Sequence, residues 1–222
     1  GNRMSKTKKV LALVLAVMML VTMTSFPAFA ADEATVKIKS ITSAMKPYGN
    51  DTLPGCAIDG NRDTSFMAEA NGSPVTTDFT LDQWYELNGF YSLWGKSGWN
   101  YETEPNWFTI SVSADGETYT EIYRKDDAHQ GKGLQTIEDA LSYPAKTIPT
   151  RYIRLYGDYK SMWLFALAEI SFKGTVTTYE NAVSYTVRYV DKDGNDLIPA
   201  YTDQGADGVT VFATAKTAAD DK

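Results

Sequence analysis

A loop at residues 59–64 is rich in side chains that bind metal ions, and its sequence is DGNRDT. A hard cation such as calcium takes about six to eight oxygen ligands, and carboxylate, amide and hydroxyl oxygens crowded around a glycine turn supply them. The same residue types also form metal-free turns, in which an Asp or Asn side chain accepts a backbone hydrogen bond. The loop by itself therefore favours a metal-free turn, and a calcium site is the alternative.

A second segment, from Trp94 to Trp107, has the residue types that bind sugars and reads WGKSGWNYETEPNW. Sugar rings carry apolar C–H faces that stack on flat aromatic rings, while their hydroxyls need a few convergent polar groups. The candidate ligand-binding residues are the aromatic side chains of this segment, one later tryptophan and three polar neighbours: Trp94, Trp99, Tyr101, Trp107, Trp163, Lys96, Asn100 and Glu102. The alternative for Trp94 and Trp107, which stand at strand ends, is a place at least half buried in the core.

The chain offers few residues for catalysis. It contains one histidine, His129, and one cysteine, Cys56, so a His-based triad, a multi-histidine metal site and an internal disulfide are all disfavoured. Catalysis would have to rest on carboxylates, and glycosidases place two of them about 5 to 10 Å apart. Glu102 and Glu104 would face the same side of an extended loop, but acids in polar loops are usually only solvated. We expect no enzymatic activity from this domain.

Short strands must position these two loops. Apolar and polar residues alternate along residues 108–113, which is typical of a strand with one buried face. An Asp115-Gly116 turn follows, and a second strand continues through Tyr123 to complete a hairpin. Comparable patterns predict further strands at residues 34–43, 78–81, 86–94, 151–156 and 167–172.

The remaining segments predict little regular structure. Residues 46–77 contain many prolines and glycines and indicate a long irregular loop, a length that usually has a function or is tied by a metal. Residues 125–149 are polar and indicate a partly helical connection. Seven or eight short strands with almost no helix predict an antiparallel sandwich.

Five stretches of the sequence resemble the discoidin family, the coagulation factor 5/8 type C domains, whose bacterial members include the family 32 carbohydrate-binding modules. They are AIDGNRDTSF at 57–66, DFTLDQWYELNGFYSLW at 78–94, FTISVSADGETY at 108–119, RYIRLYG at 151–157 and LAEISFKG at 167–174. The resemblance spans residues 34–174 in the family's order. It implies an all-β, discoidin-like fold, an eight-stranded jelly-roll sandwich that binds its ligand through loops at one end.

The resemblance also implies a structural calcium ion. In the family this ion is held by the loop that corresponds to residues 59–64, and it is closed from across the sandwich by an acid near the last strand. Carried over to this chain, the ligands are Asp59, Asn61 and Thr64, with Glu169 as the closing carboxylate.

The function implied is that of a non-catalytic carbohydrate-binding module. Galactose-binding members tend to have an arginine where this chain has Lys96, so the resemblance does not extend to galactose specificity. We expect the partners to be glycans of host mucins or dietary polysaccharides. The alternatives are an adhesin that binds protein or phospholipid, and a targeting module of a larger glycan-active enzyme.

The first thirty residues predict a secretory signal peptide. Three lysines precede an apolar run that begins at Val10 and ends in the small-residue pattern Ala28-Phe29-Ala30. An uncleaved anchor is the alternative. Removal of residues 1–30 takes four basic residues and no acid from a chain of net charge −7, which leaves −11. A protein this acidic is not expected to bind nucleic acid or anionic membranes, because both are negatively charged and would repel it.

The end of the chain predicts a separate β segment. A linker at residues 176–181 follows the sandwich domain, which we place at residues 32–175. Residues 182–222 resemble the first hairpin of mucin-binding (MucBP) repeats in Gram-positive surface proteins, with a turn at Asp193-Gly194 and a return through Leu197 and Ile198. The expectation is an extracellular protein attached to a Gram-positive cell surface, continuing into further sequence.

Overall fold

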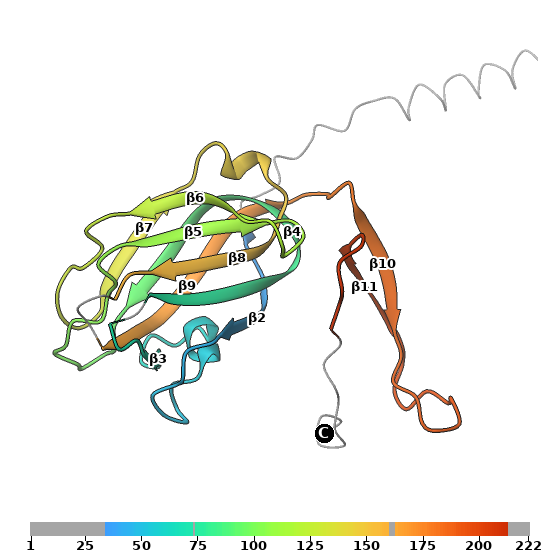
Figure 1. The fold of residues 1–222 in the computed structure, drawn as a ribbon, viewed down its shortest axis with the longest axis horizontal. Coiled ribbons are helices and arrows are strands. Elements are labelled where there is room, and N and C mark those ends of the chain that lie inside the picture. The colour runs from blue at the N-terminus through green and yellow to red at the C-terminus, as the bar shows by residue number, and fades with distance from the viewer. Residues whose placement is uncertain (1–33, 73, 160–162, 213–222) are drawn as a thin grey trace, which may run out of the picture. The chain divides into compact units, whose positions relative to one another are not determined.

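The structure, a computed structural model, describes residues 34–72, 74–159 and 163–212 (Figure 1). The predicted signal peptide lies outside these residues. Within them, no helix has the length and apolar character needed to cross a membrane. The elements are β1 (Ala34–Thr35), β2 (Ile38–Ser43), η1 (Pro54–Ile58), β3 (Phe66–Glu69), β4 (Val75–Trp94), β5 (Phe108–Ser113), β6 (Thr120–Lys125), β7 (Gln135–Ala140), η2 (Ala145–Thr147), β8 (Thr150–Gly157), β9 (Leu164–Val176), β10 (Ala182–Val187) and β11 (Tyr201–Ala206).

In the described part of the chain, nine strands join in one antiparallel hydrogen-bonded system. Its path is β1-β9-β4-β8-β5-β6, with β2 and β7 also paired to β4 and β3 paired to β9. The arrangement confirms the predicted all-β jelly-roll sandwich, with nine paired strands where the resemblance implied eight. Six phenylalanines fill the core between the layers, each at most 1% exposed: Phe66, Phe79, Phe90, Phe108, Phe165 and Phe172.

Strand β4 serves both layers of the sandwich. Its first half pairs with β2 and β8, and its second half pairs with β7 and β9. The ladder with β8 is irregular between Thr80 and Tyr85, where the chain passes from one layer to the other. The two strands predicted at 78–81 and 86–94 are therefore the two halves of one element. Trp84 anchors the passage, since its buried indole N–H donates to the carbonyl of Ala114 at 2.9 Å.

The predicted hairpin at residues 108–123 is confirmed. β5 lies between β6 and β8, and the apolar side chains of its inner face are buried. Gly116 takes a φ of 80°, which a glycine adopts without steric cost. The Asp115 carboxylate accepts the backbone N–H groups of Glu117 and Thr118, which closes the turn.

Two predictions of irregular structure are wrong in part. Residues 46–77 contain η1, β3 and the start of β4, and residues 125–149 contain β7 and a single short turn of 3-10 helix rather than a longer helix. β7 was missed because Ile137 is its one buried residue, so the strand lacks an alternating apolar pattern. Long-range pairing with β4 residues 89–94 produces the strand.

The strand register brings several loops to one end of the sandwich. Val75 and Phe108 both pair with Gly157, so the start of β4, the start of β5 and the end of β8 meet there. Glu69 pairs with Leu164, which adds the end of β3 and the start of β9. The loops that join these strand ends are close together although they are far apart in sequence.

The C-terminal hairpin pairs β10 with β11, from Ala182 opposite Ala206 to Val187 opposite Tyr201. A turn at Asp193-Gly194 is present, with Gly194 at a φ of 86°. As predicted, the chain returns beside its incoming arm after this turn, since Val190 forms a bridge with Asp196 and the Leu197 N–H donates to the Tyr189 carbonyl at 2.7 Å. The longer returning strand is β11.

Arg151, on β8, makes a buried ion pair with Asp203 on β11. The Arg151 side chain is 4% exposed, its Nη2 lies 3.1 Å from the Asp203 Oδ1, and its guanidinium lies 4.6 Å from the Trp84 ring centroid. Lys39 binds the second oxygen of Asp203 at 2.8 Å. Burial opposes ionisation of Asp203, but the Lys39 hydrogen bond and both cations lower its pKa from 3.8 to about 2.

This ion pair predicts an acid-dependent loss of stability. A carboxyl whose pKa is lower in the folded state stabilises the fold above its unfolded value, and that contribution disappears as pH falls through the folded value. Asp203→Asn should therefore be less stable than the wild type at pH 7, and the difference should shrink between about pH 4 and pH 2. Urea unfolding across this range measures the effect. Asp78→Asn, at the more exposed pair with Arg154, should retain the Asp203-dependent acid slope.

Candidate functional site

Four aromatic side chains from three loops gather at the loop end of the sandwich. We call Tyr48, Trp99, Tyr101 and Trp163 the aromatic patch. The ring centroid of Tyr48 lies 6.0 Å from that of Trp163 and 6.5 Å from that of Trp99, and Trp99 lies 5.6 Å from Tyr101. Tyr48, Tyr101 and Trp163 are 50%, 62% and 52% exposed, while Trp99 is half buried. Much aromatic surface is therefore open to a ligand.

Tyr48 enters the patch because its segment pairs with β3. Its backbone N–H donates to the carbonyl of Met67 at 2.9 Å, and the preceding Pro47 forms a bridge with Ala68. Tyr48 is not among the residues predicted from the sequence, since nothing local links it to a loop about fifty residues away. Its place between a proline and a glycine was the one available sign of an exposed loop aromatic.

Trp163 and Trp99 are held by different contacts. The carbonyl of Trp163 accepts the N–H groups of Ala70 and Asn71 at 2.7 and 3.1 Å, which ties the start of β9 to the end of β3. One side of Trp99 packs on a small apolar cluster separate from the main core, formed by Met67, Leu164 and Ala166. The framework therefore fixes the backbone of Trp163 and supports one side of the Trp99 indole.

The rings of the patch are tilted against one another. The planes of Tyr48 and Trp99 meet at 86°, those of Tyr48 and Trp163 at 58°, and those of Trp99 and Tyr101 at 68°. Flat stacking on all of them by one rigid surface is impossible. Their faces and edges suit a small ring-shaped ligand that is contacted from more than one side.

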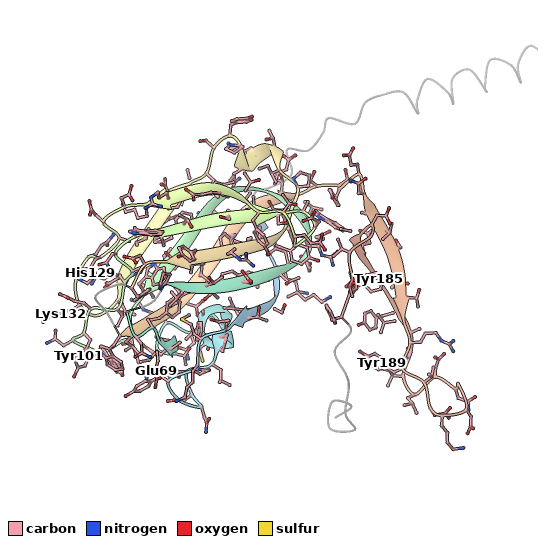
Figure 2. The ribbon with its side chains drawn as sticks, viewed as in Figure 1. Glu69, Tyr101, His129, Lys132, Tyr185 and Tyr189 are labelled. Carbon is pink, nitrogen blue, oxygen red and sulfur yellow. The ribbon has the colours of Figure 1, made fainter. Side chains whose placement is uncertain are left out.

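Polar groups surround the aromatic patch. The Lys96 ammonium lies 5.5 Å from the Trp99 ring centroid, and Asn100 is exposed beside it in the chain. Figure 2 shows Glu69 and Tyr101 at the same end of the sandwich as His129 and Lys132. Hydrogen-bond donors and acceptors are thus available next to the stacking surfaces, as sugar hydroxyls require.

Two of the predicted ligand tryptophans lie outside the patch. Trp94 is 1% exposed and packs in the core with its ring centroid 5.5 Å from Phe108 and 5.6 Å from Phe165, so burial removes it from the proposed site. Trp107 is half buried, and the Arg124 guanidinium lies 4.1 Å from its ring centroid. This agrees with the alternative predicted from the sequence, in which Trp94 and Trp107 stand at strand ends and are at least half buried.

The two acids of the aromatic loop do not share an accessible face. Glu104 is fully buried, and burial raises its pKa. Glu102 is about half exposed and its Oε2 lies 3.1 Å from the Nε2 of His129. The expectation that both face the same side of an extended loop is wrong, because the chain turns inward between them.

The loop at residues 59–64 forms a compact array of oxygens. The Asp59 carboxylate accepts the backbone N–H of Asn61 at 2.8 Å and the hydroxyl of Thr64 at 2.6 Å. The side-chain oxygen of Asn61 accepts the N–H of Asp63 at 3.0 Å, and Gly60 has a φ of 74°. Burial opposes ionisation of Asp59, but these hydrogen bonds hold its pKa below the usual range. The loop therefore has the geometry of consecutive Asx turns.

Glu169, on β9, faces this loop. Burial, and then the neighbouring Asp59 carboxyl, raise its pKa to about 7, and its buried Oε1 has no hydrogen-bond partner. Two facing carboxyls with an unpaired oxygen fit a cation, because it would neutralise both. Asp59, Asn61, Thr64 and Glu169 are the residues that would hold it. Across the described ranges no group of three or more His, Cys, Asp and Glu could hold a metal, so this set depends on amide and hydroxyl oxygens.

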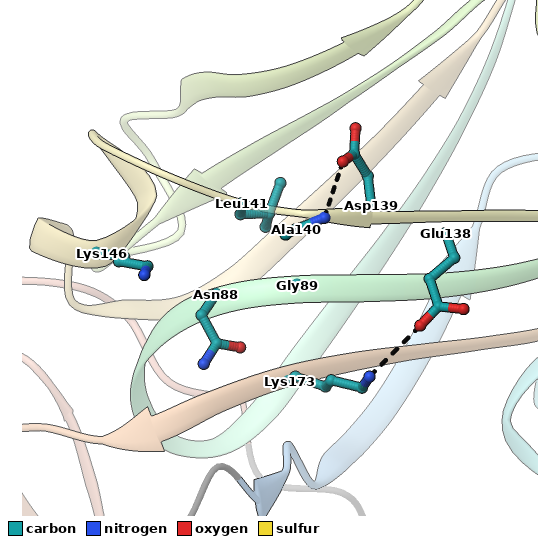
Figure 3. A pocket seen from close by; sticks show the side chains of 8 residues that line it. All are labelled: Asn88, Gly89, Glu138, Asp139, Ala140, Leu141, Lys146 and Lys173. Carbon is teal, nitrogen blue, oxygen red and sulfur yellow. Dashed lines mark hydrogen bonds and ion pairs between the residues drawn. The ribbon is translucent and has the colours of Figure 1, made fainter. Parts of the chain in front are cut away.

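A hollow of about 410 Å³ lies elsewhere on the sandwich, where β4, β7 and β9 adjoin (Figure 3). Its charged groups are partly paired, since the Lys173 Nζ lies 3.4 Å from the Glu138 Oε1. It offers no aromatic ring for stacking, so we place the candidate ligand site at the aromatic patch. Its lining residues are Asn88, Gly89, Glu138, Asp139, Ala140, Leu141, Lys146 and Lys173.

Comparison with known proteins finds a family model and similar solved structures. The model described as F5/8 type C domain matches residues 37–170, which include the aromatic patch and the oxygen-rich loop. CBM32 of AlyQ in complex with 4,5-unsaturated mannuronic acid is 24% identical with a TM-score of 0.47, over 63% of this chain and 97% of that one. CpGH89CBM32-5 from Clostridium perfringens, in complex with GalNAc-β-1,3-galactose, is 21% identical with a TM-score of 0.49, over 63% and 99%.

A third structure, the C-terminal domain of a chitobiase from Bacteroides fragilis, is 18% identical with a TM-score of 0.49, over 64% of this chain and 95% of that one. No curated protein sequence matches the chain.

Proposed function

The chain belongs to the F5/8 type C domain family, and from this premise we propose that it is a non-catalytic carbohydrate-binding module whose glycan ligand binds at the aromatic patch. The observation that carries the proposal is the patch itself. Four aromatic rings from three loops stand within 6.5 Å of a neighbouring ring, and three of them are half exposed or more. Large exposed aromatic clusters mark binding surfaces.

Binding at the patch combines stacking with hydrogen bonds. The apolar C–H face of a sugar ring covers Trp163 or Trp99, which removes apolar surface of both partners from water. Lys96 and Asn100 lie on the same loop as Trp99 and donate hydrogen bonds to sugar hydroxyls. The partners we propose are glycans of host mucins or dietary polysaccharides.

Calcium has a structural part in this proposal. Bound by Asp59, Asn61, Thr64 and Glu169, it would supply positive charge that ties the loop at residues 59–64 to β9. The support is the chemistry of the oxygen set and the unpaired Oε1 of Glu169. The chain's own residues already hold the loop in shape, so the ion adds stability rather than contacts to the glycan.

We also propose that the protein is secreted and acts in adhesion at a Gram-positive cell surface. The support is the sequence of residues 1–30, with its basic start, apolar run and small-residue end, and the resemblance of residues 182–222 to MucBP repeats. A targeting role within a larger glycan-active protein is equally consistent with a non-catalytic module.

A glycan array tests the proposed function. The purified protein, in buffer with calcium, should bind a defined subset of immobilised glycans, and free glycan of the same structure should compete. Liposomes of anionic phospholipid should not bind, because the protein carries a net charge of −7. Liposome binding together with a blank array would replace this proposal by the phospholipid alternative.

A further inference from the structure

The aromatic loop, residues 95–107, is supported by a second loop, residues 126–134, which connects β6 to β7. Backbone pairing joins the two loops at Glu102 and Lys132. Gly95 lies so close to the carbonyl of Gly133 that a side chain at Gly95 would collide with it. The position of the aromatic loop therefore depends on the second loop.

His129 is the side chain of the second loop that reaches across this contact. Its Nε2 lies 3.1 Å from the Oε2 of Glu102, and its Nδ1 lies 3.5 Å from the backbone carbonyl of Glu104. Both ring nitrogens face acceptors. A neutral imidazole has one N–H and donates to only one of them, whereas the protonated ring donates to both.

The groups around His129 come from both loops and from the segment after β8. Two carboxyls come from the aromatic loop, with the Glu104 carboxyl buried at a raised pKa and one of its oxygens without a partner. Tyr159 comes from the segment after β8, and its buried hydroxyl donates to the carbonyl of Thr103 at 2.7 Å. The charged groups of the second loop itself are Asp126, which pairs with Arg124, and Asp127 and Lys132.

We propose that His129 is a positioning residue for the aromatic patch, which holds Trp99 and Tyr101 in place through Glu102 and Glu104 and does so most firmly when its imidazole is protonated. Tyr101 is the residue directly before Glu102, so a bond that fixes Glu102 also fixes the start of the Tyr101 side chain. Trp99 is then held in place by the contact of its ring with Tyr101. This inference rests on the proposed function, and it adds pH control to the same site.

The test is the pH profile of glycan affinity. With a glycan identified on the array, wild-type affinity should rise about three- to tenfold between about pH 8 and pH 5, the range expected when one hydrogen bond is gained. His129→Leu should bind weakly at every pH. His129→Gln should recover part of the affinity without pH dependence, because its amide donates to Glu102 whatever the pH. Equal profiles for the wild type and His129→Leu would overturn the proposal.

A second measurement needs no glycan. NMR spectra of the free protein should show the Tyr101 and Trp99 ring signals shifting together with the His129 titration, and the shifts should vanish in His129→Leu. Glu138→Gln, at an exposed ion pair with Lys173, should leave them unchanged. If the ring signals follow His129 but no glycan binds, the positioning role stands and the proposed function fails. If they do not follow it, the positioning role fails.

Discussion

Replacing Trp163 by alanine should weaken glycan binding by about ten- to a hundredfold, because a truncated tryptophan at the centre of an interface typically costs about 2 kcal/mol or more. Trp163 is 52% exposed and has a fixed backbone, so the loss is that of a stacking surface and not of the fold. Isothermal titration with a glycan chosen from the array measures the change. Trp99→Ala should have a comparable effect.

Two further variants distinguish the aromatic patch from the segment at residues 94–107, which contains two of its four residues. Tyr48→Ala should also weaken binding, since Tyr48 contacts both Trp163 and Trp99. Trp107→Ala serves as the control and should change affinity by less than about twofold, because its ring contacts Arg124 rather than the patch. Unchanged binding in both Trp99→Ala and Trp163→Ala would eliminate the proposed site.

Calcium should raise the melting temperature of the protein by about 5 to 10 °C. An ion that binds only the folded state at a hundred times its Kd stabilises it by about 2.7 kcal/mol, and each kcal/mol shifts a domain of this size by about 2 to 4 °C. The reason is that Asp59 and Glu169 face each other, so a cation bound between them would neutralise both carboxylates. Differential scanning calorimetry in calcium and in EDTA measures the shift.

Substitutions at the loop test which oxygens take part. Glu169→Gln keeps the shape of the side chain and removes its charge, so the response to calcium should fall sharply. Asp63→Asn should keep the full response, since only its backbone N–H takes part in the loop through the bond to Asn61. A melting temperature that is the same with calcium and with EDTA would exclude a structural ion.

Strand periodicity made much of the fold predictable. The β5–β6 hairpin follows from local alternation and one glycine turn, and the structure places β5 at the bounds that the pattern indicates. β7 did not follow from its own sequence, because its one buried side chain, Ile137, leaves no pattern to detect. Such a strand is specified by the neighbour it pairs with, and local patterns contain no information about pairing.

The sequence predicted the kind of residue that forms the candidate site, but it predicted only some of the residues themselves. Residue types and spacing indicated Trp99, Tyr101 and Trp163. In the structure Trp99 contacts Tyr101, and Tyr48 lies between Trp99 and Trp163 and contacts both. Tyr48 joins them only because of a backbone bond to Met67. Trp94 has the same chemistry as the others, yet its position on the inner face of β4 buries it.

The separate support beneath Trp99 has a consequence for how this domain diversifies. Met67, Leu164 and Ala166 form a cluster apart from the main core. A substitution in the aromatic loop therefore disturbs the packing of these three side chains and not that of the main hydrophobic core. Loop variants thus lose little stability while they change the contact surface. Libraries at residues 96–102 should yield mostly folded proteins, which makes the module a practical starting point for selecting new sugar specificities.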